Sequence, residues 1–303
     1  MKIKEITKEG TLYLLVKSVE AKETKTGKPY VVLSVTDGTD EVQAKMWDTT
    51  LQAAEPMIGT VISATLSVDS YGHTVREQRP IMPGEVNIAD FIPTCPVKPE
   101  KLYADIMGII GTMADMDLQR LVNHIYTENK DALIKSSAAK MMHHNTIGGL
   151  LWHSYRMTQI AMKMADIYNS ANRDMIVAGC LLHDIGKLVE LETDNFGTAE
   201  YTTMGKLFGH LYIGGTMIEN AGAKLDTPSH KVMQLVHIVV SHHGQQEMGA
   251  VVKPQTLEAY IVSEIDMMDS KIYQFEKATA SVEEGAFSDK VFGLGNIQVY
   301  HPE

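Results

Sequence analysis

The sequence has few cysteines, no long hydrophobic run and no excess of basic residues. Cys95 and Cys180 are its only cysteines, too few for a disulfide framework or a cysteine-based zinc cluster. An apolar run of about 18 residues and an apolar signal segment are both missing, so we expect no membrane association and a cytoplasmic location. The formal net charge of −11 argues against a general nucleic-acid coat protein. It leaves open an enzyme that holds a few phosphates through metal ions.

Residues 1–92 have the pattern of short β-strands. The apolar runs that predict strands are TLYLLVKSV, PYVVLSV, EVQAKMW and TVISATLSV, and turn signals separate them. Asp37–Gly38 predicts a hairpin between the second and third runs. In the third run apolar residues alternate with Gln43, Lys45 and Trp47, so one face is apolar and the other carries a cation and an aromatic ring. Roughly five short strands in a segment of this length are typical of a small closed barrel such as an OB-fold.

The rest of the sequence has a helical period. The chain of 303 residues is long for one core, which favours two domains. Prolines within 93–100 predict a semi-rigid linker. We expect connecting helices over 101–142, a helical core over 143–284 and a C-terminal tail over 285–303. The apolar spacing predicts helices over 149–168, 173–190, 226–244 and 255–275. The predicted fold class is a multidomain α and β protein, with a small β-barrel followed by an all-α domain.

The stretch CLLHDIGK, residues 180–187, places a histidine and an aspartate side by side in an apolar run. About 0.7 such pairs are expected by chance in a chain of this composition, so the pair alone is weak evidence. Further histidines and aspartates lie in or beside apolar helical stretches, however. The whole set is His153, His183, Asp184, His210, His242, His243 and Asp266. One buried histidine is usually a hydrogen-bonded core residue, but so many buried polar groups are costly unless they bind metal together. Their nitrogen and oxygen ligands suit Mn, Fe, Co, Ni or Zn.

The order of these residues resembles known sequence motifs. His153, then His183–Asp184, then Asp266 resembles the signature of the HD phosphohydrolase superfamily. The stretches MMHHNTIGGLLWH, LLHDIGK, GKLFGHLYIGG, SHHG and EAYIVSEIDMMDSK follow the β-rich segment, and FSDKVFGLGNIQVYHP forms the tail. In that order they resemble the YhaM family of bacterial 3′→5′ exoribonucleases, which consist of an OB-fold and an HD domain. The resemblance covers nearly the whole chain.

The resemblance implies two divalent metal ions, with Mn²⁺ expected before Fe, Co, Ni or Zn. The first ion would be held by His153, His183, Asp184 and Asp266. Asp184 would bridge to a second ion held by His210, His242 and His243. Some HD enzymes bind a third ion through a glutamate where this chain has Gly149, so two ions are expected at most. Asp269 is expected to orient a ligand rather than to bind metal.

The resemblance also implies roles in catalysis and substrate binding. Asp184 and Lys187 are the expected catalytic residues, and Lys187 would contact a phosphate oxygen beyond a helix end at Gly186. His143 and His144 would lie at the substrate mouth. On the barrel, Lys45 and Trp47 are the expected contacts to a single strand, because such binding uses stacking and positive charge.

The expected activity is 3′→5′ hydrolysis of single-stranded RNA to nucleoside 5′-monophosphates, with single-stranded DNA as a further substrate. Two metal ions suit this chemistry because they neutralise the phosphodiester and lower the pKa of the attacking water. A homo-oligomer is expected, since an acidic chain would profit from several barrels around one entrance. Two alternatives stay open: a phosphohydrolase of nucleotides or cyclic dinucleotides, and a non-catalytic nucleic-acid-binding protein.

Overall fold

The computed structural model describes residues 1–24, 26–70, 72–91, 94–136, 146–193, 199–280 and 282–303. The chain divides into two compact units, Met1–Pro93 and Thr94–Glu303, and each is described by itself. Among the described residues, no helix combines the length and the apolar character needed to cross a bilayer.

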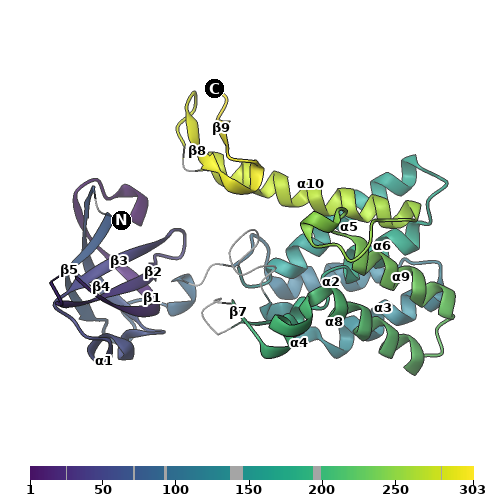
Figure 1. Ribbon diagram of the computed structural model, residues 1–303, viewed down its shortest axis with the longest axis horizontal. Helices are drawn as coiled ribbons and strands as arrows, with labels where there is room; N and C mark the ends of the chain where they lie inside the picture. Colours follow the sequence, from purple (N-terminus) through teal and green to yellow (C-terminus); the bar gives the residue numbers. More distant parts are fainter. Residues whose placement is uncertain (25, 71, 92–93, 137–145, 194–198, 281) are drawn as a thin grey trace. The chain divides into compact units, whose positions relative to one another are not determined.

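The first unit is a closed β-barrel with the strand order β1-β2-β3-β5-β4 (Figure 1). The strands are β1 (Glu9–Glu23), β2 (Pro29–Thr36), β3 (Glu41–Trp47), β4 (Val61–Asp69) and β5 (Gly72–Pro80). The parallel pairing of β3 with β5 closes the barrel, whereas its other strand pairs are antiparallel. Strand β1 pairs first with β4 and then with β2, and the bulge between Val16 and Ser18 bends it around the corner. The predicted small barrel is confirmed.

The apolar side chains of the alternating strands fill the inside of this barrel. Leu14, Leu33 and Leu66 are fully buried there. The predicted hairpin at Asp37–Gly38 forms between β2 and β3, and the Asp37 carboxylate accepts backbone hydrogen bonds of 2.8 and 2.9 Å within the turn. Short helical turns surround the strands: η1 (Ile3–Glu5), α1 (Leu51–Ala54), η2 (Glu55–Met57) and η3 (Ile88–Phe91).

The outer face of β3 carries the cation and the aromatic ring that the alternation predicts. Trp47 is 43% exposed, and its ring centroid lies 4.7 Å from that of Tyr30 on the neighbouring strand β2. The ammonium nitrogen of Lys45 lies 5.9 Å from the Trp47 ring centroid. Two aromatic rings and a cation therefore share one surface of the barrel.

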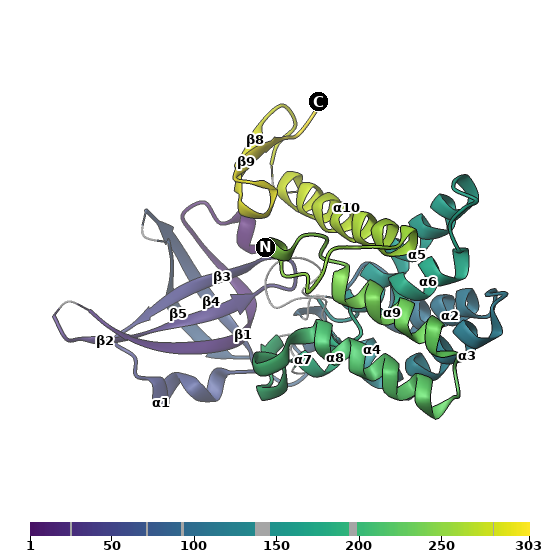
Figure 2. The ribbon, with the colours of Figure 1, turned by 45° about the vertical axis from the view of Figure 1, so that its right-hand side comes forward.

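The second unit is helical apart from two short hairpins. Its helices are α2 (Pro99–Ile110), α3 (Met116–Glu128), α4 (Lys130–Lys135), α5 (Gly149–Ile167), α6 (Arg173–Leu182), α7 (Lys187–Glu190), α8 (Thr203–Lys224), α9 (Ser229–Ser241), α10 (Leu257–Thr279) and the turn η4 (Gln246–Met248). One hairpin joins β6 (Leu191–Thr193) to β7 (Ala199–Tyr201). The other joins β8 (Phe287–Val291) to β9 (Ile297–Tyr300) through η5 (Phe292–Leu294) and lies at the C-terminal end of α10 (Figure 2).

One hydrophobic core holds the helices of the second unit together. Leu102 of α2, Leu118 of α3 and Leu133 of α4 belong to the same buried cluster as Leu181 and Val262 of the later helices. The helices within residues 101–142, which the sequence predicts as connecting helices, thus contribute to the core itself. Helix α2 begins at a proline that the sequence assigns to the linker, because proline is favoured at the first position of a helix.

Candidate metal centre

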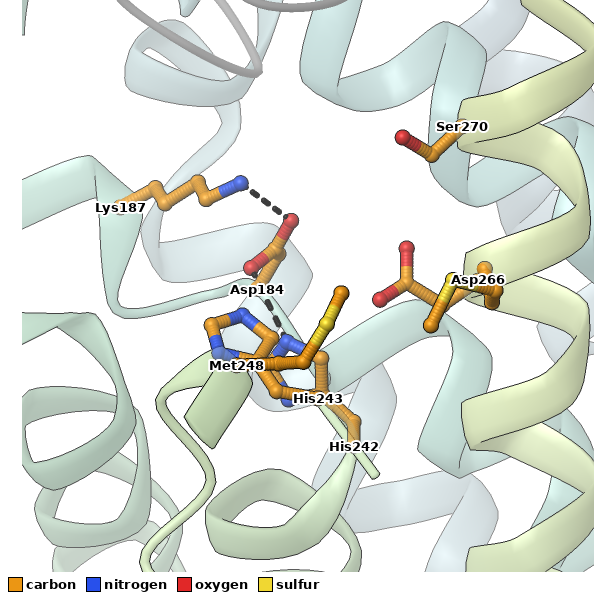
Figure 3. A pocket seen from close by; sticks show the side chains of 8 residues that line it. Asp184, Lys187, His242, His243, Met248, Asp266 and Ser270 are labelled. Atoms are coloured by element: carbon orange, nitrogen blue, oxygen red, sulfur yellow. Dashed lines mark ion pairs between the residues drawn. The ribbon is translucent and has the colours of Figure 1, made fainter. Parts of the chain in front are cut away.

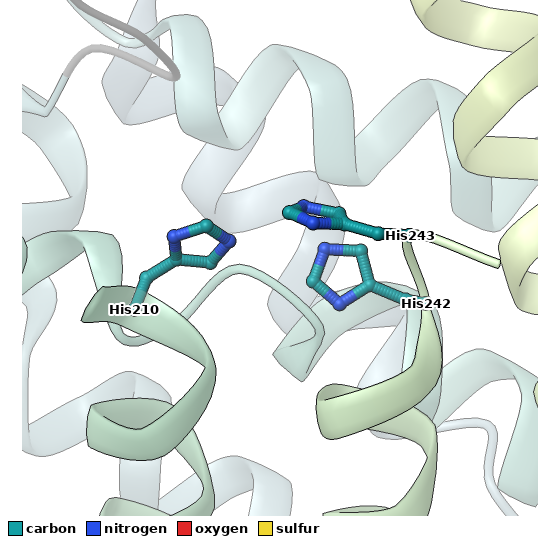
Figure 4. A group of neighbouring side chains, drawn as sticks. All are labelled: His210, His242 and His243. Carbon is teal, nitrogen blue, oxygen red and sulfur yellow. The ribbon is translucent and has the colours of Figure 1, made fainter. Parts of the chain in front are cut away.

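Five helical elements of the second unit bring the predicted ligands together. His153 lies on α5, His183 and Asp184 follow α6, His210 lies on α8, His242 and His243 follow α9, and Asp266 lies on α10. Three groups of these residues have ligand atoms within 4.8 Å of one another. The groups are His153 with His183 and Asp184, His183 with His242 and Asp266, and His210 with His242 and His243. Figure 4 shows the three rings of the last group facing one another.

Helix α6 ends earlier than the apolar spacing predicts. Its last residue is Leu182, and His183 is the C-cap. The ring Nδ1 of His183 donates to the carbonyl oxygen of Cys180 at 2.9 Å, which satisfies one of the free carbonyl groups at the helix end. The prediction that Gly186 ends this helix is therefore wrong. Gly186 is instead the N-cap of the short helix α7, which begins at Lys187.

Gly186 is required for close packing rather than for its backbone angles. A Cβ atom there would lie 2.1 Å from the carbonyl oxygen of His210 and 2.6 Å from the amide nitrogen of Gly214. The chain that carries Asp184 therefore packs directly on the backbone of α8. This contact fixes the distance between the chain segment of Asp184 and the backbone of His210.

We expect Gly186→Ala to lower the free energy of unfolding by about 1–2 kcal/mol, because an added methyl group must push this backbone contact apart. Urea unfolding followed by circular dichroism measures the change. Gly108→Ala is the matched control, since Gly108 lies in helix α2 with no atom within 4 Å of an added Cβ, and alanine stabilises a helix interior. Equal unfolding midpoints for Gly186→Ala and the wild type would contradict the packing argument.

Four of the histidines are oriented in the same way. Each uses its Nδ1 atom for a hydrogen bond with the surrounding protein: His153 with Asp269 at 2.8 Å, His183 with the Cys180 carbonyl at 2.9 Å, His210 with Glu190 at 3.1 Å and His242 with the Val239 carbonyl at 2.8 Å. A carbonyl oxygen only accepts, so Nδ1 of His183 and His242 carries the proton. Their Nε2 lone pairs are then available to a metal ion.

The Asp184 carboxylate lies at the centre of these rings. Its Oδ2 atom lies 3.2 Å from Nε2 of His183, and its Oδ1 atom lies 3.4 Å from Nε2 of His210 and 3.6 Å from Nε2 of His242. The ammonium group of Lys187 contacts Oδ2 at 2.7 Å (Figure 3). Burial alone would raise the pKa of Asp184, but the charges of Lys187 and His183 outweigh it and lower the pKa well below its usual range. Asp184 is therefore an ionised, buried carboxylate shared by both sides of the cluster.

The cluster fits divalent metal ions. Four of its buried atoms make no hydrogen bond with the part of the chain that the structure describes: His183 Nε2, Asp184 Oδ1, His210 Nε2 and His243 Nδ1. Each such atom costs about 1–3 kcal/mol when it is left without a partner. Bound cations would satisfy these atoms, and imidazole nitrogens with carboxylate oxygens are ligands of first-row divalent metals. Burial, together with the nearby His183, lowers the pKa of His242 well below its usual value, so that ring is neutral as a ligand requires.

His153 is held between two carboxylates. Its Nε2 atom lies 3.1 Å from Asp266 Oδ1, and its Nδ1 atom lies 2.8 Å from Asp269 Oδ2. Burial lowers the pKa of His153, but the hydrogen bonds to Asp266 and Asp269 outweigh this and raise it to about 9. Arg156, one turn further along α5, contacts Asp269 Oδ1 at 2.7 Å. Asp269 is thus positioned to orient His153, as the sequence predicts.

Glu190 is a neighbour of the cluster that sequence reasoning missed. Its Oε1 atom accepts a hydrogen bond from the backbone N–H of His210 at 3.0 Å and lies 3.1 Å from the ring Nδ1 of the same residue. Gly209 makes this possible, because its φ of 69° and ψ of 160° break the helical path of α8 just before His210. Only glycine readily adopts that backbone conformation. The glycine before His210 was the available sequence signal, but it does not identify the partner.

The structure brings all seven predicted ligands together, with Lys187 beside them. Lys45 and Trp47 lie on β3 of the other unit. His143 and His144 lie outside the described residues. Cys180 is fully buried, and burial raises the pKa of its thiol, as expected for a packed cysteine rather than a nucleophile.

Comparison with known proteins agrees with this geometry. Residues 150–271 match the model of the HD domain family, which spans the ligands from His153 to Asp266. The 3′-5′ exoribonuclease YhaM of Bacillus licheniformis is 34% identical over 98% of this chain and 96% of its own length. The proteins of the same name from Geobacillus and Bacillus subtilis are each 32% identical over 98% of this chain, covering 93% and 96% of their own lengths. Because the similarity extends over both units, the chain belongs to the YhaM family of 3′-5′ exoribonucleases.

Proposed function

We propose that this protein is a metal-dependent 3′→5′ exoribonuclease that hydrolyses single-stranded RNA to nucleoside 5′-monophosphates. The observation that carries the proposal is the common orientation of three imidazoles, those of His183, His210 and His242, whose Nε2 atoms lie within 3.6 Å of the buried Asp184 carboxylate. Structural histidines in a core satisfy both ring nitrogens with protein groups, whereas here one nitrogen of several rings is kept for another partner. The relatives named above are exoribonucleases, which favours RNA as the polymer.

Two groups of residues would hold the ions. His153, His183, Asp184 and Asp266 form the first group, and His210, His242 and His243 form the second, with Asp184 shared between them. Manganese is the proposed metal, and the nitrogen and carboxylate oxygen ligands suit it as they also suit iron, cobalt, nickel and zinc. When bound, the two ions would neutralise the phosphodiester and increase the nucleophilicity of water.

The protein's own groups position the ligands and the substrate. Asp269 and Glu190 orient the rings of His153 and His210 before an ion binds. The charge of Lys187 is stabilised in its buried position by Asp184, which raises its pKa despite desolvation. Lys187 therefore stays cationic beside the shared carboxylate, where it can bind a non-bridging phosphate oxygen.

A 5′-labelled single-stranded RNA tests the activity. With Mn²⁺ we expect progressive shortening from the 3′ end and release of nucleoside 5′-monophosphates, and with a chelator we expect neither. The same assay with single-stranded DNA and with a cyclic dinucleotide defines the substrate class. Failure to release mononucleotides from RNA in the presence of Mn²⁺, Fe²⁺ or Co²⁺ would overturn the proposal.

We expect Trp47→Ala to weaken the binding of single-stranded RNA by about 10-fold, because stacking of a base on an aromatic ring contributes about 1–3 kcal/mol. We assign the Tyr30–Trp47 ring pair on the barrel to stacking with a base of the substrate. Fluorescence anisotropy of a labelled oligonucleotide with Ca²⁺ in place of Mn²⁺ measures the affinity. Leu51→Ala is the control, since Leu51 is similarly exposed at 41% and has no aromatic ring. Unchanged affinity in Trp47→Ala would contradict the proposal that this surface of the barrel binds RNA.

A further inference from the structure

The side chains that line the pocket at the metal centre divide into two chemical kinds. Asp184, Lys187, His242, His243 and Asp266 are titratable groups of the metal centre, whereas Met248, Met267 and Ser270 are uncharged. The pocket has a volume of about 150 Å³, below the roughly 300–1,000 Å³ of a typical small-molecule site, so a bound nucleotide would fill it and extend beyond it. A nucleotide has the same division, with an anionic phosphate at one end and a flat aromatic base at the other.

Backbone hydrogen bonds hold the segment that carries Met248 at this pocket. It ends η4, just after His243, and its amide donates to the carbonyl oxygen of Gln245 at 3.0 Å. The segment is tied back to α9 by a hydrogen bond of 2.9 Å from the Val251 amide to the Val240 carbonyl. The side chain is 56% exposed and extends into the space between Asp184 and Asp266 (Figure 3).

Met267 is the second thioether that lines the pocket. It is half-buried, follows Asp266 directly on α10 and lines the same pocket. A thioether contacts an aromatic ring favourably, and its unbranched chain adapts to rings of different size. Among the described residues that line the pocket, every polar side chain except Ser270 belongs to the metal centre, which leaves the two thioethers to contact the base.

We propose that Met248 and Met267 form the subsite for the 3′-terminal nucleobase and hold it without distinguishing between the four bases. This inference rests on the proposed exonuclease activity and adds the residues that position the departing nucleotide. The terminal phosphodiester contacts the charged groups of the metal centre while the base contacts the two thioethers. The subsite raises the affinity for the terminal nucleotide and accepts purines and pyrimidines alike.

The test uses RNA oligonucleotides that differ only at the 3′-terminal residue, which carries adenine, uracil or no base. For the wild type we expect similar KM values with adenine and uracil, and a KM about 3- to 10-fold higher without a base, the range that one or two sulfur–aromatic contacts provide. Met248→Ala should raise the KM for both base-carrying substrates by a similar factor and leave the abasic KM and all kcat values within about 2-fold. A further rise is expected for Met248→Ala combined with Met267→Ala.

Two further variants separate contact from folding. Met248→Leu keeps the apolar volume and should restore most of the affinity. Met233→Ala removes a methionine that is 65% exposed on α9 and does not line this pocket, and it should leave every KM unchanged. Thermal unfolding identifies a misfolded double variant, in which case the single Met248 variant decides.

The outcomes distinguish this inference from the activity on which it rests. If the wild type removes no terminal residue from any of the three substrates, the exonuclease proposal and the base subsite both fail. If the wild type is active but Met248→Ala raises the KM of abasic and base-carrying substrates equally, or of neither, the base subsite alone is overturned.

Discussion

Asp184→Asn is expected to lower the rate of RNA hydrolysis by about 10³-fold or more, since each factor of ten corresponds to about 1.4 kcal/mol of activation free energy and charge stabilisation by metals contributes several kcal/mol. The substitution keeps the size of the side chain and removes the negative charge. Asp184 Oδ1 lies within 3.6 Å of Nε2 of both His210 and His242, while Oδ2 faces His183. One change therefore affects both groups of ligands, and metal analysis should find fewer than two ions per chain.

The matched control is Asp226→Asn. Asp226 is an exposed aspartate of the same unit with a φ of 51°, a backbone conformation that asparagine adopts readily. It should keep full activity and full metal content. Retention of more than a tenth of the wild-type rate by Asp184→Asn, with circular dichroism showing a folded protein, would show that Asp184 is not shared between two ions. It would also remove the main support for a two-metal reaction.

The ligand set could be predicted because its residue types are unusual in apolar helical segments. His153 lies among Leu150 and Met157 on one helix face, and Asp266 lies beside Ala259 and Val262, so their burial follows from periodicity alone. Which group each ligand joins does not follow from periodicity. His242 shows this, because it belongs to one group with His210 and to another with His183 and Asp266.

The parts of the fold that the sequence did not predict have local causes. Strand β5, GHTVREQRP, has no apolar alternation, and only Thr74 and Val75 of its side chains are buried, so it forms because β3 and β4 pair with it. The end of α6 was hidden because LLHDIGKLVE continues the helical spacing. There the His183 ring donates a hydrogen bond to a backbone carbonyl three residues earlier. The hydrophobic pattern of the sequence does not predict this hydrogen bond.

Glu190 shows more clearly why part of the site could not be predicted from the sequence, because its role comes from contacts with a residue 20 positions away. In the sequence it is one charge in KLVELE, and such a residue is usually solvated. In the structure it is 8% exposed, and burial would raise its pKa. The hydrogen bonds from His210 outweigh this and lower the pKa, so the carboxylate is ionised and accepts a hydrogen bond from the Nδ1–H group of the His210 ring.

Glu190→Gln is therefore expected to weaken the second metal group selectively. An amide is a weaker acceptor than a carboxylate, so it holds the His210 ring less firmly and makes Nε2 a poorer ligand. Loss of such a partner usually lowers metal affinity by about 10- to 100-fold. We expect titration with Mn²⁺ to give one site of unchanged affinity and one weakened by this factor, and activity to recover when Mn²⁺ is raised.

Glu192→Gln is the control, since Glu192 is exposed on β6 only two residues away and should leave both affinities unchanged. Recovery at high Mn²⁺ matters because it separates weaker binding from the loss of a catalytic group. Asp184→Asn should not recover, because its carboxylate belongs to both groups, whereas Glu190 acts on one ring only. If both sites weaken equally in Glu190→Gln, the two groups of ligands are not independent, and the assignment of His210, His242 and His243 to a separate ion is wrong.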